Sequence, residues 1–382
     1  MKTYKTFIKT RKTKNKPKIY NDIDRLLFDL EEETETDIDE FLTLDLQPEE
    51  FYKSNKLENQ SDYITATYNE MKNWLDNHPD FLENENNYYY SFKIPKRKGG
   101  FRQIDAPIDE LKEIQDTILH LFINILNILP HNAAHAYVKG RSTITMAQKH
   151  KNNNCIIKLD IKDFFNSITA NILREQLLKQ EIFIKINELC DKNFINLLVL
   201  IATKNGTLVQ GNPLSPFLSN MIMLDFDHRL TKAISTHRIP YYTYTRYADD
   251  IYLSAPKFRY SKKVVNFIDN LLKECYNNNI LLNKEKTNFL KITNKCYITG
   301  LKLNKDHNVT FGHEQKRQLK LKLYNLFVAY NLNQCPKEEI QEVLGLFSYM
   351  KAIEPNYANY LERKYLTQFE SRATTLYKHF KF

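Results

Sequence analysis

An α+β fold is expected from two sets of patterns that occupy different parts of the chain. Residues 88–107 alternate apolar and polar side chains on either side of a Lys-Gly-Gly turn, and residues 243–255 are strand-like on both sides of a polar centre. Residues 110–129 and 313–330 instead have apolar side chains at helical spacing. The chain has 382 residues, 42% of them hydrophobic, which is enough for a core and for more than one subdomain.

Composition and charge favour a nucleic-acid partner. The net charge is +9, which suits a polyanion. The N-terminus lacks the apolar core of a signal peptide, and the longest apolar runs are too short to span a bilayer. Five cysteines are scattered without a CxxC pair, so we expect reduced thiols and no disulfide framework. These features predict a cytoplasmic protein with no membrane partner.

The N-terminal region is charged, and residues 1–85 are expected to form an accessory extension. Residues 1–18 are a basic tail, which either binds nucleic acid or is simply solvated. Residues 29–40 are acidic, and such consecutive carboxylates suit a solvated helix or linker better than a metal site. From 62 to 85 the apolar side chains have the spacing of an amphipathic helix.

The hairpin expected at 88–107 is basic. Its turn and flanks carry Lys93, Lys96, Arg97, Lys98 and Arg102. Such a hairpin either lies over a triphosphate or phosphate backbone, or is merely solvated. The helix at 110–129 is expected to pack against the core and to end before Pro130.

Carboxylates interrupt two strand-like runs. Residues 156–168 begin as a buried strand with Asp160 near its end, and Asp249 and Asp250 occupy the turn of the hairpin at 243–255. Burying adjacent carboxylates is costly unless a cation neutralises them. If the two strands are neighbours, the carboxylates converge, and hard oxygen ligands suit Mg²⁺ or Mn²⁺. Two such ions can activate an attacking 3′-hydroxyl and stabilise a pyrophosphate leaving group.

These segments resemble the catalytic motifs of bacterial reverse transcriptases. The run TYTRYADDIYLSA (243–255) resembles the catalytic hairpin of that family, and KLDIKDFFNSI (158–168) resembles its first palm motif. Five further segments also resemble family motifs, and all of them follow the family's order: FKIPKRKGGFRQIDAP (92–107), HAYVKGRS (135–142), QGNPLSPFLSN (210–220), NKEKTNFL (283–290) and YITGLKLN (297–304). The resemblance covers roughly residues 88–375 and implies a right-hand polymerase fold.

The resemblance also implies three regions of that fold. Residues 86–152 would form the fingers, and residues 153–312 would form a palm made of an antiparallel sheet with helices and some interleaved finger elements. Residues 313–382 would form a helical thumb. In the thumb helix at 313–330, Lys316 and Lys320 lie on a basic face that either tracks a duplex backbone or is solvated.

Roles for individual residues follow from the same resemblance. Asp160, Asp249 and Asp250 would hold two Mg²⁺ ions (Mn²⁺ as the alternative) with the carbonyl of Ile161. The remaining residues would bind the triphosphate (Arg102, Lys96), line the nucleotide pocket (Gln210, Gly211), exclude the ribose 2′-hydroxyl (Phe165), approach the pyrophosphate as proton donor (Lys286) and contact the primer (Tyr247, Gly300, Leu301).

The expected activity is RNA-directed DNA synthesis from dNTPs on a structured noncoding RNA, in bacterial antiphage defence. A partner protein or a second copy of the chain is also expected. The chain departs from retron enzymes at Ile298, where they favour Val, and at Met146, where they favour Asn. We therefore favour a defence-associated enzyme over a retron enzyme that makes branched RNA–DNA. A template-independent or protein-guided DNA polymerase of the abortive-infection type stays open, while Phe165 opposes an RNA polymerase.

Overall fold

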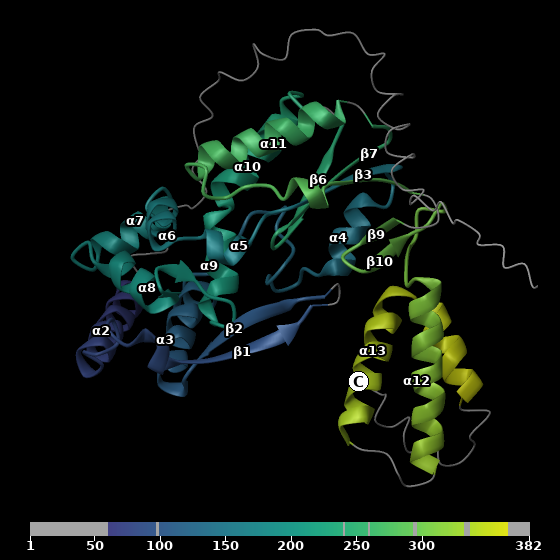
Figure 1. Ribbon diagram of the computed structural model, residues 1–382, viewed down its shortest axis with the longest axis horizontal. Helices are drawn as coiled ribbons and strands as arrows, with labels where there is room; N and C mark the ends of the chain where they lie inside the picture. The colour runs from purple at the N-terminus through teal and green to yellow at the C-terminus, as the bar shows by residue number, and fades with distance from the viewer. Residues whose placement is uncertain are drawn as a thin grey trace, which may run out of the picture.

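The computed structural model describes residues 60–96, 99–239, 241–258, 260–292, 296–331 and 337–365. The basic tail at 1–18 and the acidic run at 29–40 lie outside these residues. Figure 1 shows a body of helices and antiparallel strands, with a separate group of helices at the C-terminal end. This mixture confirms the expected α+β class.

The first described elements include the hairpin expected at 88–107. They are α2 (Ser61–Asn77), a 3-10 turn η4 (Glu85–Tyr88), β1 (Tyr89–Pro95), β2 (Phe101–Pro107), α3 (Asp109–His120) and a π-helical turn η5 (Leu121–Ile125). Strands β1 and β2 pair antiparallel from Tyr89↔Pro107 to Pro95↔Phe101, and we call them the fingers hairpin. The expected helix at 110–129 therefore ends in a π turn before Pro130.

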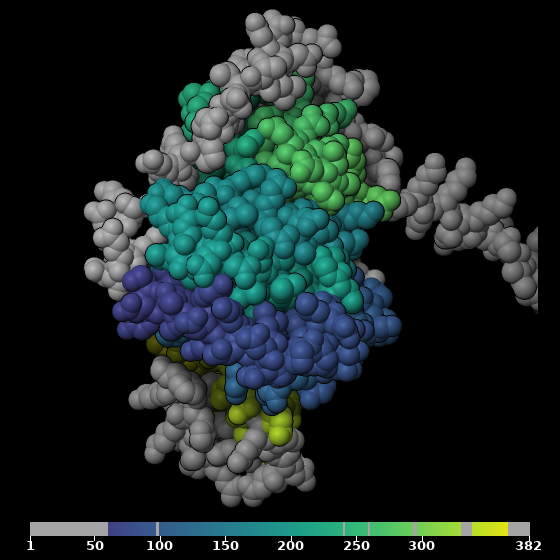
Figure 2. Space-filling model, turned by 90° about the vertical axis from the view of Figure 1, so that its left-hand side faces the viewer, coloured from purple at the N-terminus to yellow at the C-terminus, as the bar shows by residue number. Residues whose placement is uncertain are grey.

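Helix α2 belongs to the main core, although the sequence placed it in an accessory extension. Its buried Ile64, Tyr68 and Met71 join the apolar cluster that also contains residues of α3 and α8. Figure 2 shows α2, in purple, directly against the teal body. The helix ends at Asn77, short of the expected 85, and its Tyr63 is exposed. The boundary drawn at residue 85 thus does not follow the packing.

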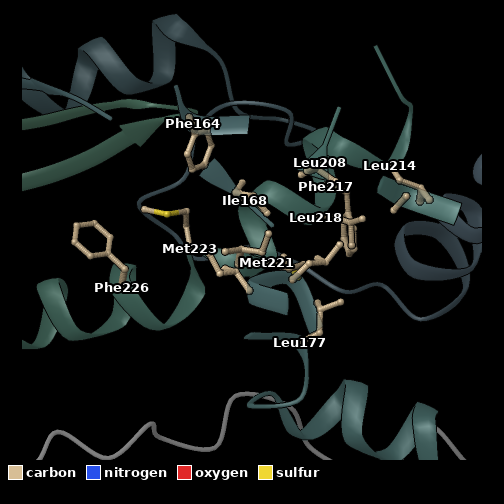
Figure 3. Close-up of a cluster of buried hydrophobic side chains, with 14 of the residues drawn as sticks. Phe164, Ile168, Leu177, Leu208, Leu214, Phe217, Leu218, Met221, Met223 and Phe226 are labelled. Atoms are coloured by element: carbon tan, nitrogen blue, oxygen red, sulfur yellow. The ribbon is translucent and has the colours of Figure 1, made fainter. Parts of the chain in front are cut away.

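The central helices build the core beneath the cavity described below. They are α5 (Phe164–Ser167), α6 (Ala170–Leu177), α7 (Glu181–Glu188), α8 (Phe194–Ala202), α9 (Leu214–Ile222) and α10 (Leu224–Ser235), with the short strands β4 (Thr203–Lys204) and β5 (Thr207–Leu208). Helix α4 (Thr143–His150) instead buries Met146 and Ala147 in a second cluster. Figure 3 shows side chains of α9 clustered with Phe164 of α5, Leu177 of α6 and Phe226 of α10.

The palm sheet is antiparallel, with the strand order β6-β7-β3-β8 among the described residues. Its strands are β3 (Cys155–Asp160), β6 (Thr243–Tyr247), β7 (Asp250–Ala255) and β8 (Asn288–Lys291), with α11 (Ser261–Cys275) and the 3-10 turn η6 (Lys284–Lys286) between β7 and β8. Helices α10 and α11 lie together beside this sheet in Figure 1.

Strand β3 supplies side chains to two separate cores. Ile157 and Leu159 belong to the large core, while Ile156 belongs to a second cluster on the other face. The alternation follows from the pleat, which points successive side chains to opposite faces. In β7, Tyr252 belongs to the second cluster and Ile251 to the first, so both faces of the sheet are covered.

The second core joins the palm sheet to the C-terminal helices. It includes residues of β9 (Cys296–Ile298), β10 (Leu301–Leu303), α12 (His313–Asn331) and α13 (Lys337–Ile353), and β11 (Val309–Thr310) pairs with β10. The expected apolar stripe of α12 is buried at Leu319, Leu323, Leu326 and Phe327. Residues 355–365 form a further helix, which supplies Leu361 to this core.

Two expectations from composition concern the described residues as a whole. None of the helices described is long and apolar enough to cross a membrane. Cys155, Cys190, Cys275 and Cys296 are free and buried, whereas Cys335 lies outside the described residues.

Candidate active site

Three carboxylates meet at one end of the palm sheet. Strands β3 and β7 are neighbours, and Asp160, the last residue of β3, is paired with Asp250, the first residue of β7. Tyr247 pairs with Asp250 across the β6–β7 turn, which leaves Ala248 and Asp249 as its two central residues. The amide of Ile161 donates to the carbonyl of Asp249 at 2.9 Å and fixes the turn against the end of β3. The convergence required by the sequence argument is therefore present.

The negative charge of the three carboxylates favours the binding of cations at this end of the sheet. Burial, then the charges of Asp250 and Asp160, raises the pKa of Asp249. Two ammonium groups offset this repulsion: Lys158 Nζ lies 2.9 Å from Asp250 Oδ2, and Lys286 Nζ lies 3.0 Å from Asp160 Oδ2. The carboxylate cluster thus attracts positive charge from two directions.

The donor set fits a hard divalent ion in chemistry. Carboxylate and carbonyl oxygens, as supplied by Asp160, Ile161, Asp249 and Asp250, are the ligands such ions prefer. In the part of the chain that is described, no three His, Cys, Asp or Glu side chains are grouped as a ready metal site. The carboxylates of Asp250 and Asp160 are ion-paired with Lys158 and Lys286. These ammonium groups would have to move away before both carboxylates could coordinate a metal ion.

A cavity of about 1450 Å³ opens over these carboxylates. Its walls come from the fingers hairpin, the end of β3, α5, the segment before α9, the β6–β7 turn and η6. It is lined by every residue that the sequence assigned to metal, catalysis or nucleotide: Lys96, Arg102, Asp160, Ile161, Phe165, Gln210, Gly211, Asp249, Asp250 and Lys286. Residues up to 190 positions apart in the chain, from Lys96 to Lys286, therefore share one space.

The two adjacent phenylalanines have different surroundings. Phe164 is buried and packs in the core, while Phe165 is partly buried and packs against that core at its edge. Both rings contribute to the lining of the cavity. The left-handed backbone of Asp163, with φ of +44°, precedes α5 and turns the chain at this point. This arrangement agrees with Phe164 as a core residue and leaves Phe165 as the candidate sugar gate.

Gly211 allows the fingers hairpin to lie close to the segment before α9. The amide of Asp105 donates to the carbonyl of Gln210 at 2.8 Å. Gly211 has φ of +120°, and a Cβ built on it would lie 2.7 Å from the carbonyl oxygen of Asp105. A glycine is therefore required by both the backbone conformation and the space.

The residues assigned to the primer lie outside the cavity lining. Tyr247 is half-buried and packs against the second core. Thr299 and Gly300 form the β9–β10 turn, and both have positive φ, as a type I′ hairpin requires. The side chain of Leu301 is buried in the second core, so only its backbone is available to a primer.

The two lysines assigned to the basic face of α12 differ in their surroundings. Lys316 is 25% exposed, pairs with Glu354 at 2.6 Å and lies 4.8 Å from the centre of the Tyr357 ring. Its charge is therefore balanced within the thumb, and its contact with a nucleic-acid backbone stays a prediction. Lys320 is exposed, as that assignment requires.

Three residues that the sequence argument did not assign also belong to the site or support it. Tyr137 lines the cavity, is 53% exposed and has φ of +61°. Lys204 lines the cavity as a buried cation. Arg246 lies beneath the β6–β7 turn and donates to the carbonyl of Ala248. Lys204 precedes Asn205-Gly206, a hairpin signal that was available in the sequence.

Arg246 holds the β6–β7 turn from inside the protein. Its guanidinium donates to Asp227 Oδ2 at 2.6 Å, to Asn220 Oδ1 at 3.2 Å and to the carbonyl of Ala248 at 3.2 Å. Arg246 and Asp227 are both fully buried, and Tyr244 donates to the same carboxylate at 2.5 Å. A charge-assisted network therefore connects α9 and α10 to the turn that carries Asp249.

Comparisons with known proteins agree with this geometry. The model of the family described as reverse transcriptase (RNA-dependent DNA polymerase) matches residues 94–353. The retron Ec83 reverse transcriptase of Escherichia coli is 29% identical over 283 residues, or 73% of this chain and 87% of the relative. The retron Ec73 reverse transcriptase of the same species is 30% identical over 72% of this chain and 86% of the relative.

A solved structure was also matched. It is that of telomerase from Candida albicans with a fragment of telomeric RNA, at a TM-score of 0.41 and 15% identity over 74% of this chain and 61% of the other. This likeness is too distant to carry an argument. The family match covers more than half of the chain and confirms the right-hand polymerase fold. The chain belongs to the reverse transcriptase family and is an RNA-directed DNA polymerase, an enzyme that copies an RNA template.

Proposed function

We propose that the cavity binds a dNTP and that Asp160, Asp249 and Asp250 hold two Mg²⁺ ions there with the carbonyl of Ile161. Reverse transcriptases use divalent metal ions, and Mg²⁺ suits an all-oxygen set that also receives substrate phosphates. The observation that carries the proposal is the convergence of the three carboxylates within the cavity. When bound, such ions activate the 3′-hydroxyl and stabilise the leaving pyrophosphate.

The other residues of the cavity bind and orient the nucleotide. Arg102 and Lys96, on the fingers hairpin, are the cations that would hold the triphosphate. Phe165 would fill the space beside C2′ and reject a ribose 2′-hydroxyl. Lys286 is 62% exposed and reaches Asp160, so its ammonium is able to approach the pyrophosphate and donate a proton to it.

Template and biological role form a second part of the proposal. The template would be a structured noncoding RNA, and the DNA product would serve antiphage defence, with a partner protein or a second copy of the chain. The curated relatives described above are named retron reverse transcriptases, which supports the retron alternative more than the two departures at Ile298 and Met146 oppose it. A branched RNA–DNA product is therefore the second candidate.

One experiment tests both parts. The full chain is purified from a host that carries its native flanking DNA, as the wild type and as Asp249→Asn, and the bound nucleic acid is sequenced. We expect a flanking-encoded RNA with both proteins, but complementary DNA with the wild type alone. Asp191→Asn is the matched control, because Asp191 is exposed, lies away from the cavity and has a left-handed backbone that Asn accepts.

The outcomes separate the candidates. DNA joined to an internal 2′-hydroxyl of the RNA would establish the retron candidate. DNA that matches no RNA in the sample would favour template-independent synthesis. Undiminished DNA with Asp249→Asn, folded as judged by circular dichroism, would overturn the assignment of the carboxylates.

A further inference from the structure

An ion pair between the buried Lys204 and the partly buried Asp105 ties the fingers hairpin to a smaller hairpin beside the cavity. The side chain of Lys204 is 6% exposed, and its ammonium lies 2.9 Å from Asp105 Oδ1 and 3.2 Å from the hydroxyl of Ser91. It also lies 5.0 Å from the centre of the Tyr89 ring. Asp105 accepts a further hydrogen bond from Ser91. Burial opposes ionisation of Asp105, but the hydrogen bonds from Ser91 and Lys204 outweigh it and hold its pKa below the ordinary value.

The described residues of the fingers hairpin bury little apolar surface. In β1, only Tyr89 is buried and the following side chains are exposed, and in β2 only Pro107 is buried. The amide of Asp105 adds one hydrogen bond, to the carbonyl of Gln210. With so little apolar burial, the ion pair at Lys204 is a major part of the attachment of this hairpin.

The small hairpin β4–β5, which carries Lys204, is also bonded to the chain just after the sugar gate. The amide of Leu208 donates to the carbonyl of Ile168 at 2.9 Å, and the amide of Ala170 donates to the carbonyl of Gly206 at 2.9 Å. Ile168 follows Phe165 by three residues. The small hairpin therefore connects the strand of Arg102 with the segment of Phe165.

We propose that Lys204 is a positioning residue for the incoming nucleotide, because it holds the strand of Arg102 at a fixed distance from the segment of Phe165. The inference rests on the proposed dNTP site. Both walls contact the same small substrate, so a shift of about 1 Å in one wall weakens binding strongly. Lys204 acts through Asp105, and its own charge is already balanced there.

A cation that lines this cavity could instead touch the triphosphate directly. The two roles differ in what happens when both partners of the ion pair are replaced. Removing Lys204 alone leaves the partly buried Asp105 carboxylate without its cation, and the strand must move to hydrate it fully. Replacing both residues by apolar side chains of similar size removes the charge and restores packing. A direct phosphate contact would stay lost in that double variant.

The experiment measures steady-state primer extension on poly(rA) with an oligo(dT) primer and varied dTTP. The variants are Lys204→Met, Asp105→Leu and the double variant. For Lys204→Met we expect the KM for dTTP to rise about tenfold with kcat within about twofold of the wild type. The double variant should recover to within about threefold of the wild-type KM. Lys273→Met is the matched control, since Lys273 pairs with Asp269 on α11, away from the cavity.

Each result has one meaning. Recovery in the double variant supports positioning, and it is readable even if Lys204→Met alone folds poorly. A double variant with a KM as high as that of Lys204→Met would overturn positioning in favour of direct contact. An unchanged KM in every variant would overturn any role at the nucleotide site. A wild-type enzyme that incorporates no dTTP would instead contradict the proposed function.

Discussion

Replacing Arg246 with Met should destabilise the protein and loosen the β6–β7 turn. The substitution removes the positive charge that balances the buried carboxylate of Asp227. That carboxylate then keeps only the hydrogen bond from Tyr244. Removing one partner of a fully buried ion pair costs roughly 3–5 kcal/mol. That is a large share of the roughly 5–15 kcal/mol that typically separates folded from unfolded protein. At about 2 °C per kcal/mol, we expect Tm to fall by roughly 6–10 °C.

Urea unfolding followed by circular dichroism gives the free energy directly. The double variant Arg246→Met with Asp227→Leu is the informative comparison, because apolar side chains of similar volume restore most of the lost stability. Its polymerisation rate should nevertheless remain below that of the wild type. The carbonyl of Ala248 has lost its donor, so the turn that carries Asp249 is held less firmly. An Arg246→Met protein within about 1 kcal/mol of the wild type would refute the reasoning, as would a double variant no more stable than the single one.

Three further predictions address the nucleotide pocket and the palm. Phe165→Ala should raise NTP incorporation relative to dNTP incorporation. Phe164→Ala should mainly lower stability, by about 3–5 kcal/mol, because Phe164 is buried. Equal sugar discrimination in the wild type and both variants would remove Phe165 as the gate. Gly211→Ala should reduce dNTP incorporation about tenfold more than Gly100→Ala. A Cβ at position 211 would lie 2.7 Å from a carbonyl oxygen, whereas Gly100 also has a positive φ but has nothing within 4 Å of its Cβ position. Similar extension rates for the two variants would contradict this reasoning. His150 is fully buried between the hydroxyls of Ser254 and Thr245, and burial lowers its pKa to about 3. The unfolded chain binds this proton first, so stability should fall as pH drops from about 6.5 towards 3, by about 2 kcal/mol at pH 5. His150→Gln should flatten that dependence in urea unfolding, and an unchanged slope would contradict the assignment.

Local sequence patterns were sufficient to predict those parts of the site whose geometry is set by the pairing of neighbouring strands. Asp160 at a strand end and Asp249–Asp250 at a hairpin turn had to converge once the two strands paired, and they do. The fingers hairpin was equally visible, because alternation and a Lys-Gly-Gly turn specify it locally.

Ion pairs between side chains that are far apart in the sequence could not be predicted from local patterns. Lys316 appeared to be an exposed basic residue, but its partner Glu354 lies 38 positions away. Lys204 is separated from Asp105 by 99 positions, and nothing in the pattern around a lysine indicates that it is buried. Helix α2 was assigned to a charged extension because charge dominates the residues before it, whereas its apolar face packs on helices that come later in the chain.

The division of β3 between two cores has a consequence for how the protein unfolds. Ile157 and Leu159 anchor the strand to one apolar cluster, and Ile156 anchors it to the other. If the thumb helices separate, the face of the sheet that carries Ile156 and Tyr252 becomes exposed to water. Neither cluster can melt without weakening a strand that the other requires, so palm and thumb should lose their structure in a single cooperative transition.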